Sequence, residues 1–306
     1  MSAGAFGEDL VASLLTADNT AAHELLRPQS AQSKSAAITA IVKSHDVFNR
    51  AASYEPYVGR WSRRLAPEFI EWIAAERGGR WLDVGCGTGA LTEAILAHSK
   101  PSAVVGVDPS ADFIAYAAAG TSDRRATFAV GNAMELEFAD DRFDVAAAAL
   151  VLNFVPDPRR AVREMSRVVR NAGVVAAYVW DYAGEMLMIR RFWDAAVALD
   201  PAAAALDEGS RFTICNPVAL RDAYLDAGLS SVEVRALDCH MEFDDFDDYW
   251  RPFLGGQAPA PAYAMSLEEV ARERLRERIQ SMLPVDPDAK IRMVSRAWAV
   301  KGTTAK

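Results

Sequence analysis

The sequence predicts an α/β protein whose core is a doubly wound, mostly parallel sheet with helical insertions. Short apolar segments alternate with helical stretches between residues 80 and 180, and a glycine-rich turn follows the first apolar segment. The chain has 306 residues, of which 51% are hydrophobic, so it can bury a large core. We therefore expect one main domain with appendages.

A helix is expected before the first strand. Trp61, Leu65 and Phe69 recur at helical spacing, and Gly78-Gly79 stops the pattern. Strands and helices then alternate, which is typical of a parallel sheet covered by helices on both faces. The expected strands are 80–84, 104–108, 126–130, 143–152 and 174–180, and the first helices between them are 91–98 and 111–119.

Another helix is expected between the fourth and fifth strands. Asp157 is a natural N-cap, and Pro158 takes the first helical position. The segment Asn171-Ala172-Gly173 is expected to end this helix, because a glycine commonly follows a helix C-terminus.

The last third of the chain predicts further helices and two late strands. Helices are expected over 185–198 and 217–227, and strands over 232–237 and 291–300, with an acidic and aromatic insert at 241–290. In that insert Ser266-Leu267-Glu268-Glu269 has capping-box spacing and is expected to start a helix. The stretches 185–206 and 241–290 are expected to form a lid.

Three regions follow from this pattern. Residues 1–45 are rich in Ala, Ser and Thr and are expected to be a partly disordered extension. Residues 46–181 are expected to form the ligand-binding core with a covering helix at its start. Residues 182–306 are expected to supply lid helices and the strands that complete the same sheet.

The net charge and the cysteine pattern indicate which partners and which cellular compartment to expect. A formal net charge of -9 and a pI near 5.1 argue against a nucleic-acid partner, which needs clustered Lys and Arg. The three cysteines lack Cys-x-x-Cys and Cys-His spacing, so no metal site is predicted and we expect reduced thiols in a cytoplasmic protein.

The apolar runs predict a protein with no membrane span. Residues 1–9 contain no Lys or Arg for an export signal, and the longest apolar run, 145–155, is shorter than the ~20 residues that a membrane-spanning helix needs. The sequence leaves a homo-oligomer open.

The glycine-rich turn predicts a ligand site. Gly85, Gly87 and Gly89 lie between a strand and a helix, where exposed backbone N–H groups can approach a ligand closely. Their Gly-x-Gly-x-Gly spacing differs from the Gly-x-Gly-x-x-Gly of dinucleotide sites. Asp108 ends the next strand, where its carboxylate can accept hydrogen bonds from two ribose hydroxyls.

The successive motifs Leu82–Gly89, Gly106–Ser110 and Gly131-Asn132-Ala133 resemble the cofactor motifs of class I methyltransferases that use S-adenosylmethionine (SAM). The resemblance spans about residues 54–180. It implies a Rossmann-like sheet of seven strands, mostly parallel with the last one antiparallel. It also implies that the loop surrounds the methionine part and ribose, that Asp108 holds the ribose, and that Asn132 contacts the adenine amine.

The segment Tyr54–Ser62 is similar to the N-terminal segment of small-molecule methyltransferases of the ubiquinone and menaquinone biosynthesis type, where it closes over SAM. Arg60 would then pair with the cofactor carboxylate. An ordinary surface arginine and packing aromatics at Tyr54 and Tyr57 are the alternatives. The complete set of expected cofactor-binding residues is Tyr57, Arg60, Asp83, Gly85, Gly87, Gly89, Asp108, Pro109, Asn132, Ala133 and Leu150.

Methyl transfer is an in-line displacement that needs positioning and the exclusion of water more than a covalent intermediate. In this fold the acceptor lies beyond the carboxyl ends of the fourth and fifth strands. Asn153, Asp181 and His240 are the candidate catalytic residues, each with a structural role as its alternative. Asn153 is no general base, because its amide does not titrate near neutral pH.

The acidic run at 242–250 predicts either a pocket for a cationic or aromatic substrate or a solvated loop that docks its rings on the body. Methyl transfer to a small-molecule acceptor is the favoured function. The absence of a clear base keeps a non-catalytic SAM-binding regulatory or partner subunit as the alternative. An NAD-dependent oxidoreductase is disfavoured by the loop spacing.

Overall fold

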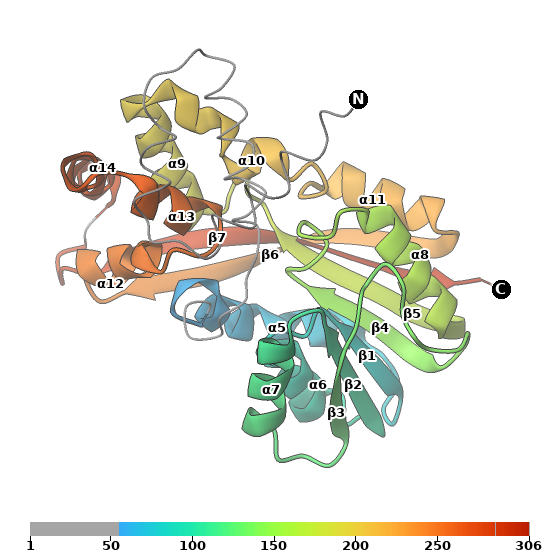
Figure 1. Ribbon diagram of the computed structural model, residues 1–306. Helices are drawn as coiled ribbons and strands as arrows, with labels where there is room; N and C mark the ends of the chain where they lie inside the picture. The colour runs from blue at the N-terminus through green and yellow to red at the C-terminus, as the bar shows by residue number, and fades with distance from the viewer. Residues whose placement is uncertain (1–54, 285, 306) are drawn as a thin grey trace, which may run out of the picture. The chain divides into compact units, whose positions relative to one another are not determined.

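The sheet of the computed structural model, which describes residues 55–284 and 286–305, has seven strands in the order β3-β2-β1-β4-β5-β7-β6 (Figure 1). Strands β1 to β5 pair in parallel, and β7 runs antiparallel to both of its neighbours. The predicted fold class is therefore confirmed. The strands are β1 (Arg80–Val84), β2 (Ala103–Asp108), β3 (Ala126–Val130), β4 (Phe143–Ala149), β5 (Val169–Trp180), β6 (Leu229–Phe243) and β7 (Ile291–Thr304).

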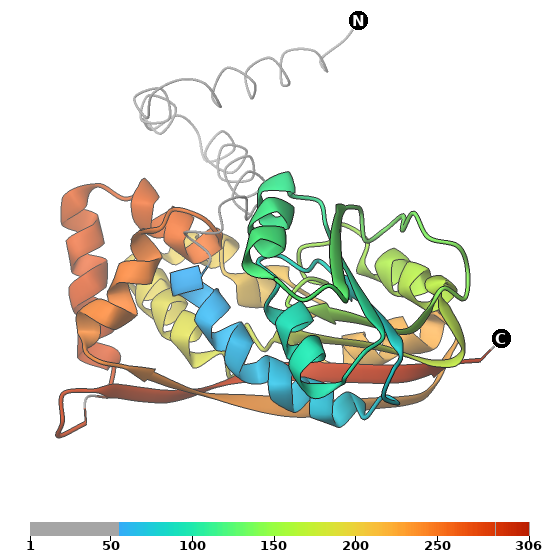
Figure 2. The ribbon, with the colours of Figure 1, turned by 90° about the horizontal axis from the view of Figure 1, so that it is seen from below.

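Helices cover both faces of the sheet, with α5 to α7 on one side and α8 with α11 on the other (Figures 1 and 2). The strand order reverses between β1 and β4, so the loops after these two strands diverge and leave room for a ligand. The helices are η1 (Glu55–Gly59), α5 (Arg60–Ile73), α6 (Ala90–His98), α7 (Ala111–Gly120), α8 (Pro158–Val168), α9 (Leu187–Leu199), η2 (Pro201–Ala205), α10 (Glu208–Arg211), α11 (Pro217–Asp226), α12 (Phe246–Trp250), η3 (Arg251–Leu254), α13 (Pro259–Ser266) and α14 (Glu269–Met282).

The β6–β7 hairpin is longer than expected and extends beyond the parallel strands. Strand β5 ends at Trp180, which is opposite Ala297, whereas the β6–β7 ladder continues to the pair Phe243 and Ile291. Figure 1 shows α9 and α12 to α14 gathered around this projecting end. The hairpin therefore positions these helices beyond the carboxyl end of β5.

Two expected helix boundaries are wrong. Helix α8 begins after the N-cap Asp157 as predicted but ends at Val168, and Asn171-Ala172-Gly173 lies inside β5. The pairing shifts there, since Phe143 is opposite Val169 while Val145 is opposite Val174. The three residues therefore form an irregularity in the strand instead of a helix end.

The capping box at Ser266 is wrong as well. Ser266 is the last residue of α13, and its hydroxyl donates to the carbonyl of Tyr263 at 2.8 Å. Helix α14 begins at Glu269 without a side-chain cap. Helix α14 follows α13 so closely that Ser266, its expected N-cap, is already the last residue of α13.

The predicted extension at 1–45 and Tyr54 lie outside the described residues. Within the described ranges, no helix combines the length and the hydrophobicity needed to cross a bilayer.

Candidate functional site

The loop between β1 and α6 adopts a backbone that requires glycine. Gly85, Gly87 and Gly89 have φ values of 71°, 51° and 90°, in the left-handed region that favours this residue. The N–H groups of Gly85 and Cys86 both donate to the carbonyl of Val107, at 2.7 and 3.0 Å. The loop is therefore tied to the end of β2, next to Asp108.

Gly85 and Gly87 have different surroundings. A Cβ atom on Gly85 would lie 2.3 Å from Cγ2 of Val151, so this position is closed by packing. A Cβ atom on Gly87 would meet no described atom within 4 Å. Gly87 therefore borders the open space into which a ligand can approach the backbone.

Asp108 is held by backbone N–H groups from two sides. Its Oδ2 accepts from Gly87 at 3.1 Å, and its Oδ1 accepts from Ser110 at 2.8 Å. Burial raises the pKa of this carboxyl, and the two backbone hydrogen bonds oppose the rise. The fixed carboxylate keeps further lone pairs with which it can accept hydrogen bonds from two neighbouring hydroxyls.

Asp83 lies at the end of β1 and is completely buried. Thr92 donates to its Oδ2 at 2.6 Å, while its Oδ1 has no hydrogen-bond partner among the described residues. Burial raises the pKa of this carboxyl to about 7. A buried oxygen without a partner is typical of a site that a ligand or water completes.

The residues expected around the adenine and ribose lie at the same edge of the sheet. Pro109 is exposed directly after Asp108, Asn132 is exposed after β3, and Ala133 is half-buried. The Oδ1 atom of Asn132 accepts from the N–H of Met134 at 2.9 Å, which fixes the amide and leaves the second lone pair of Oδ1 to accept from another donor. The contact of Asn132 with the cofactor stays a prediction.

The segment η1 lies against the glycine loop, while its closing over the cofactor stays a prediction. The hydroxyl of Thr88 donates to the carboxylate of Glu55, and Arg63 binds both Glu55 and Glu93. Tyr57 is buried, and its ring packs edge-on against Phe253 at 5.5 Å between centroids. These contacts hold η1 at the start of α6.

Arg60 pairs with the protein itself. Its Nη1 donates to the carboxylate of Asp248 at 3.0 Å, and its guanidinium lies over the rings of Trp61 and Phe243. Its Nε and Nη2 atoms are buried without hydrogen-bond partners in the described part of the chain. Pairing of these atoms with a cofactor carboxylate stays a prediction.

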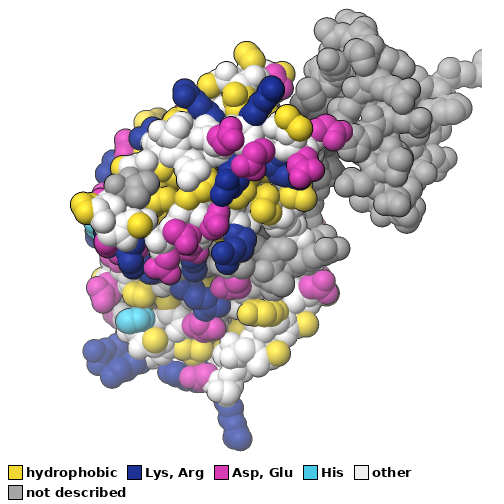
Figure 3. Space-filling view, turned by 90° about the vertical axis from the view of Figure 1, so that its left-hand side faces the viewer, with side chains coloured by type: hydrophobic (Ala, Val, Ile, Leu, Met, Phe, Trp, Pro, Cys, Tyr) yellow, Lys and Arg dark blue, Asp and Glu magenta, His cyan; other side chains and the backbone are white. Residues whose placement is uncertain are grey.

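The acidic run at 242–250 has the character of a docked, solvated segment. Glu242 pairs with Lys290 and Arg292, and Asp247 pairs with Arg276. On the face shown in Figure 3, acidic and basic side chains are intermingled. The rings of Tyr249 and Trp250 are buried in the body, and the carboxylates have partners within the protein: four of them pair with Lys or Arg, and that of Asp245 caps α12. This arrangement does not support a pocket for a cationic substrate.

The three candidate catalytic residues are not brought together. Asn153 is 8% exposed, and neither polar atom of its side chain has a hydrogen-bond partner within the described ranges. Asp181 accepts from the N–H of Glu185 at 3.0 Å and so closes the turn after β5. His240 is exposed on the face of β6 opposite the buried Cys239. Only Asn153 retains unused polar atoms in a buried position.

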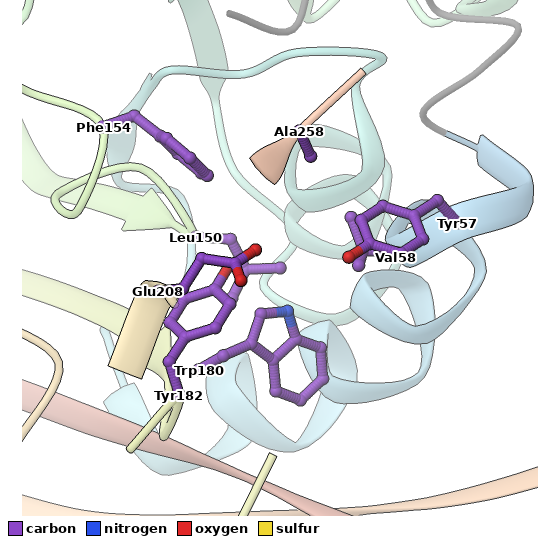
Figure 4. Close-up of a pocket in the computed structure, with 8 residues that line it drawn as sticks. All are labelled: Tyr57, Val58, Leu150, Phe154, Trp180, Tyr182, Glu208 and Ala258. Carbon is purple, nitrogen blue, oxygen red and sulfur yellow. The ribbon is translucent and has the colours of Figure 1, made fainter. Parts of the chain in front are cut away.

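A cavity lies beyond the carboxyl ends of β4 and β5. Its volume is about 10 Å³, which is enough for a single water molecule. Figure 4 shows the lining residues, which are Tyr57, Val58, Leu150, Phe154, Trp180, Tyr182, Glu208 and Ala258. Leu150 has a φ of 61°, and its N–H donates to the carbonyl of Tyr178 at 2.8 Å. Such a left-handed leucine is strained, and strain of this kind concentrates at functional sites.

Glu208 is the residue that the sequence did not single out. It is 2% exposed at the start of α10, and the indole N–H of Trp193 donates to its Oε2. Burial raises the pKa of its carboxyl to about 8. In the sequence it follows an Ala-rich stretch, and its neighbours give no sign that it is buried.

Comparison with known families assigns the core. Residues 82–177 match the family model described as "Methyltransferase domain". This segment is a class I SAM-dependent methyltransferase domain. The matched range contains β1, the glycine loop, Asp108 and Asn132, and most of β5.

Curated relatives match less than half of this chain. The chain is 39% identical over 98 residues to a demethylmenaquinone methyltransferase of Roseiflexus, which is 32% of this chain and 41% of the relative. It is 33% identical over 137 residues to one of Staphylococcus aureus, which is 44% of this chain and 55% of the relative. The chain thus spans about half the length of the curated relatives it matches.

Solved structures share the fold at low sequence identity. The YcgJ protein of Bacillus subtilis has a TM-score of 0.54 at 17% identity, covering 79% of this chain and 99% of that protein. A phosphoethanolamine N-methyltransferase of Haemonchus contortus, solved with SAM, has a TM-score of 0.52 at 16% identity, covering 79% of this chain and 53% of that protein. These similarities establish the methyltransferase fold around the site.

Proposed function

We propose that this chain transfers a methyl group from SAM to a small-molecule acceptor by direct in-line displacement. The observation that carries the proposal is Asp108, whose two oxygens are fixed by the N–H groups of Gly87 and Ser110 beside open space. A carboxylate held in this way suits the two ribose hydroxyls of SAM. The methyltransferase domain at residues 82–177 supports the same cofactor.

The chain's own residues would position the reactants. Bound SAM supplies a sulfonium-activated methyl group. The backbone of Gly87 and Gly89 borders the cofactor, Asn132 receives the adenine amine, and η1 covers the loop and excludes water. With the acceptor beyond Leu150 and Trp180, the reacting atoms can be held in line.

The small cavity beyond β4 and β5 supports a small-molecule acceptor, because it is lined mostly by buried side chains and lies below the surface, where a folded protein does not reach. The cytoplasm is the proposed location. All three cysteines of the chain are buried and free of disulfides, in keeping with a reducing compartment.

Calorimetry with SAM and with its demethylated product, S-adenosylhomocysteine, tests the cofactor part of the proposal. We expect binding in the micromolar range for both and no heat from NAD. Absence of binding by both SAM-type ligands would sink the proposal.

The alternative, a non-catalytic SAM-binding subunit, is favoured by Asn153, since an amide cannot act as a base. The two functions share the cofactor site and differ in turnover. Release of S-adenosylhomocysteine from SAM on addition of any compound from an extract would exclude the non-catalytic subunit.

A further inference from the structure

The small cavity collects three polar side chains from distant parts of the chain. Tyr57 comes from η1, Trp180 from the end of β5, and Glu208 from α10, and each is at most 2% exposed. Figure 4 shows the hydroxyl of Tyr57, the indole nitrogen of Trp180 and the carboxyl of Glu208 directed toward the space between them. The rest of the lining is apolar or aromatic.

Two of these polar groups lack partners. The hydroxyl of Tyr57 and the indole N–H of Trp180 have no hydrogen-bond partner in the described part of the chain. A buried polar group left in this state costs about 1–3 kcal/mol. Two such groups facing one cavity indicate that a ligand or water completes their hydrogen bonds.

The donors and acceptors that line the cavity determine which chemical groups a ligand must offer. The indole N–H of Trp180 only donates, so the ligand must offer an accepting atom. An ionised Glu208 carboxylate only accepts, so the ligand must also donate. A hydroxyl group does both, whereas an ammonium group can only donate. A phosphate or carboxylate is disfavoured, because the lining contains Glu208 and neither Lys nor Arg.

The shape of the lining favours a planar ring. The side chains of Phe154, Trp180 and Tyr182 supply aromatic surface on one side of the cavity. The volume of about 10 Å³ is too small for a ring, so binding requires α10 and the chain near Ala258 to move outward. Ala258 lies in the predicted lid stretch 241–290, and α10 directly follows the predicted lid stretch 185–206.

We propose that Glu208 is the catalytic base that removes the proton from a hydroxyl group on a planar aromatic acceptor. The inference rests on the proposed methyl transfer. As the acceptor oxygen forms its bond to the methyl carbon, the bond from that carbon to the sulfonium sulfur breaks and its electron pair stays on sulfur. The hydroxyl proton passes to the Glu208 carboxylate, which later releases it to solvent.

The charges around Glu208 suit a base that ionises near neutral pH. Burial raises the pKa of this carboxyl to about 8, with Asp207 adding to the rise, while the hydrogen bond from Trp193 and the charge of Arg211 oppose it. The other titratable groups near Glu208 are Tyr57, Tyr182 and Cys215, of which Tyr57 and Cys215 have pKa values that burial raises strongly. A sulfonium nearby would favour the ionised carboxylate.

The test uses the full chain with naphthol and catechol as hydroxylated probes and naphthylamine as the matched amine. With SAM, the kcat/KM of wild type for naphthol should fall as the pH drops below the Glu208 pKa of about 8, as measured by the release of S-adenosylhomocysteine. Glu208→Gln, which can still accept from Trp193, should lose this pH dependence. With SAM, Glu208→Gln should lower kcat for naphthol about 100-fold or more while SAM affinity stays unchanged.

A matched control is Glu277→Gln, which changes an exposed carboxylate on α14 and should leave both readouts unchanged. Trp180→Phe keeps an aromatic ring at this position and removes the unpartnered N–H, so it should weaken naphthol binding. It provides a second variant if Glu208→Gln folds poorly.

Three results would overturn the inference while leaving the proposed function intact. One is SAM binding with no binding or methylation of either hydroxylated probe. Another is methylation of naphthylamine in preference to naphthol. The third is equal naphthol turnover by wild type and Glu208→Gln. If wild type binds no SAM at all, the proposed function itself fails.

Discussion

The proposed cofactor side and the proposed acceptor side of this molecule differ in where their polar atoms find partners. On the cofactor side, Asp108 is held by Gly87 and Ser110, all within residues 87–110. On the acceptor side, Tyr57, Trp180 and Glu208 come from three separate segments, and two of them have unpartnered polar atoms. The cofactor side is a local motif, while the acceptor side is assembled by the tertiary fold.

This difference fits a transferase, which binds one constant ligand and one variable ligand. A constant ligand can be bound by backbone groups of a fixed loop, which side-chain changes elsewhere do not disturb. A variable acceptor can be recognised by side chains from separate segments, because loops and insertions tolerate change.

The largest expected effect comes from a substitution at Gly85, in the glycine loop of the proposed cofactor side. Gly85→Ala places a Cβ atom 2.3 Å from Val151 at a φ of 71°, so it should lower the free energy of unfolding by about 2–5 kcal/mol. Urea denaturation measures this loss. Gly78→Ala is the matched control. The φ of Gly78 is 82°, but a Cβ atom there would meet no described atom within 4 Å, so this substitution should lower the free energy of unfolding by about 1–2 kcal/mol. Equal losses at the two positions would contradict the packing argument.

The next effect tests Asp108 itself. Asp108→Ala removes the carboxylate that we propose accepts from both ribose hydroxyls, so it should weaken SAM binding about 100-fold or more, as measured by calorimetry. Asp112→Ala changes an exposed carboxylate in the first turn of α7 and serves as the control. Unchanged SAM affinity in Asp108→Ala would remove the central contact of the cofactor site.

A smaller effect concerns Glu208 on the acceptor side. Its pKa rises from 4.5 to about 8 on folding, so the folded chain holds more protons between these values and loses stability as the pH increases through them. Glu208→Gln removes this loss. Above pH ~8 its melting temperature should exceed that of wild type by about 3 °C or more, and the difference should shrink toward pH ~4.5. A pH-independent difference would show that the carboxyl is not buried as described.

The smallest effect concerns the boundary between the two sides. Arg60 and Asp248 are 32% and 31% exposed, so their ion pair is screened by solvent. If Arg60 also meets the cofactor carboxylate, Arg60→Ala should weaken SAM binding by up to about tenfold, and Asp248→Asn should leave it unchanged or slightly stronger. Calorimetry of both variants decides this, and unaltered SAM binding in Arg60→Ala would assign the arginine to the lid alone.

Much of the fold was predictable because its signals are local. The alternation of apolar strands and helices, the N-cap at Asp157 and the glycine turn each depend on neighbouring residues. The boundary at Gly173 was wrong because pairing with another strand decided it, and the boundary at Ser266 was wrong because the preceding helix extends through this residue. Strand β5 pairs with β4 from Val169 onward, and α13 uses Ser266 as its last residue.

By itself, the sequence determined the class of the sheet and the place of the cofactor loop, because a short motif carries its own geometry. Only the tertiary structure decided which side chains meet beyond the strands. It left Asp181 in a turn and His240 on an exposed face, and it buried Glu208 beside Trp180. The physical reason is that burial and hydrogen-bond satisfaction of a side chain depend on segments far away in the chain, which no local pattern specifies.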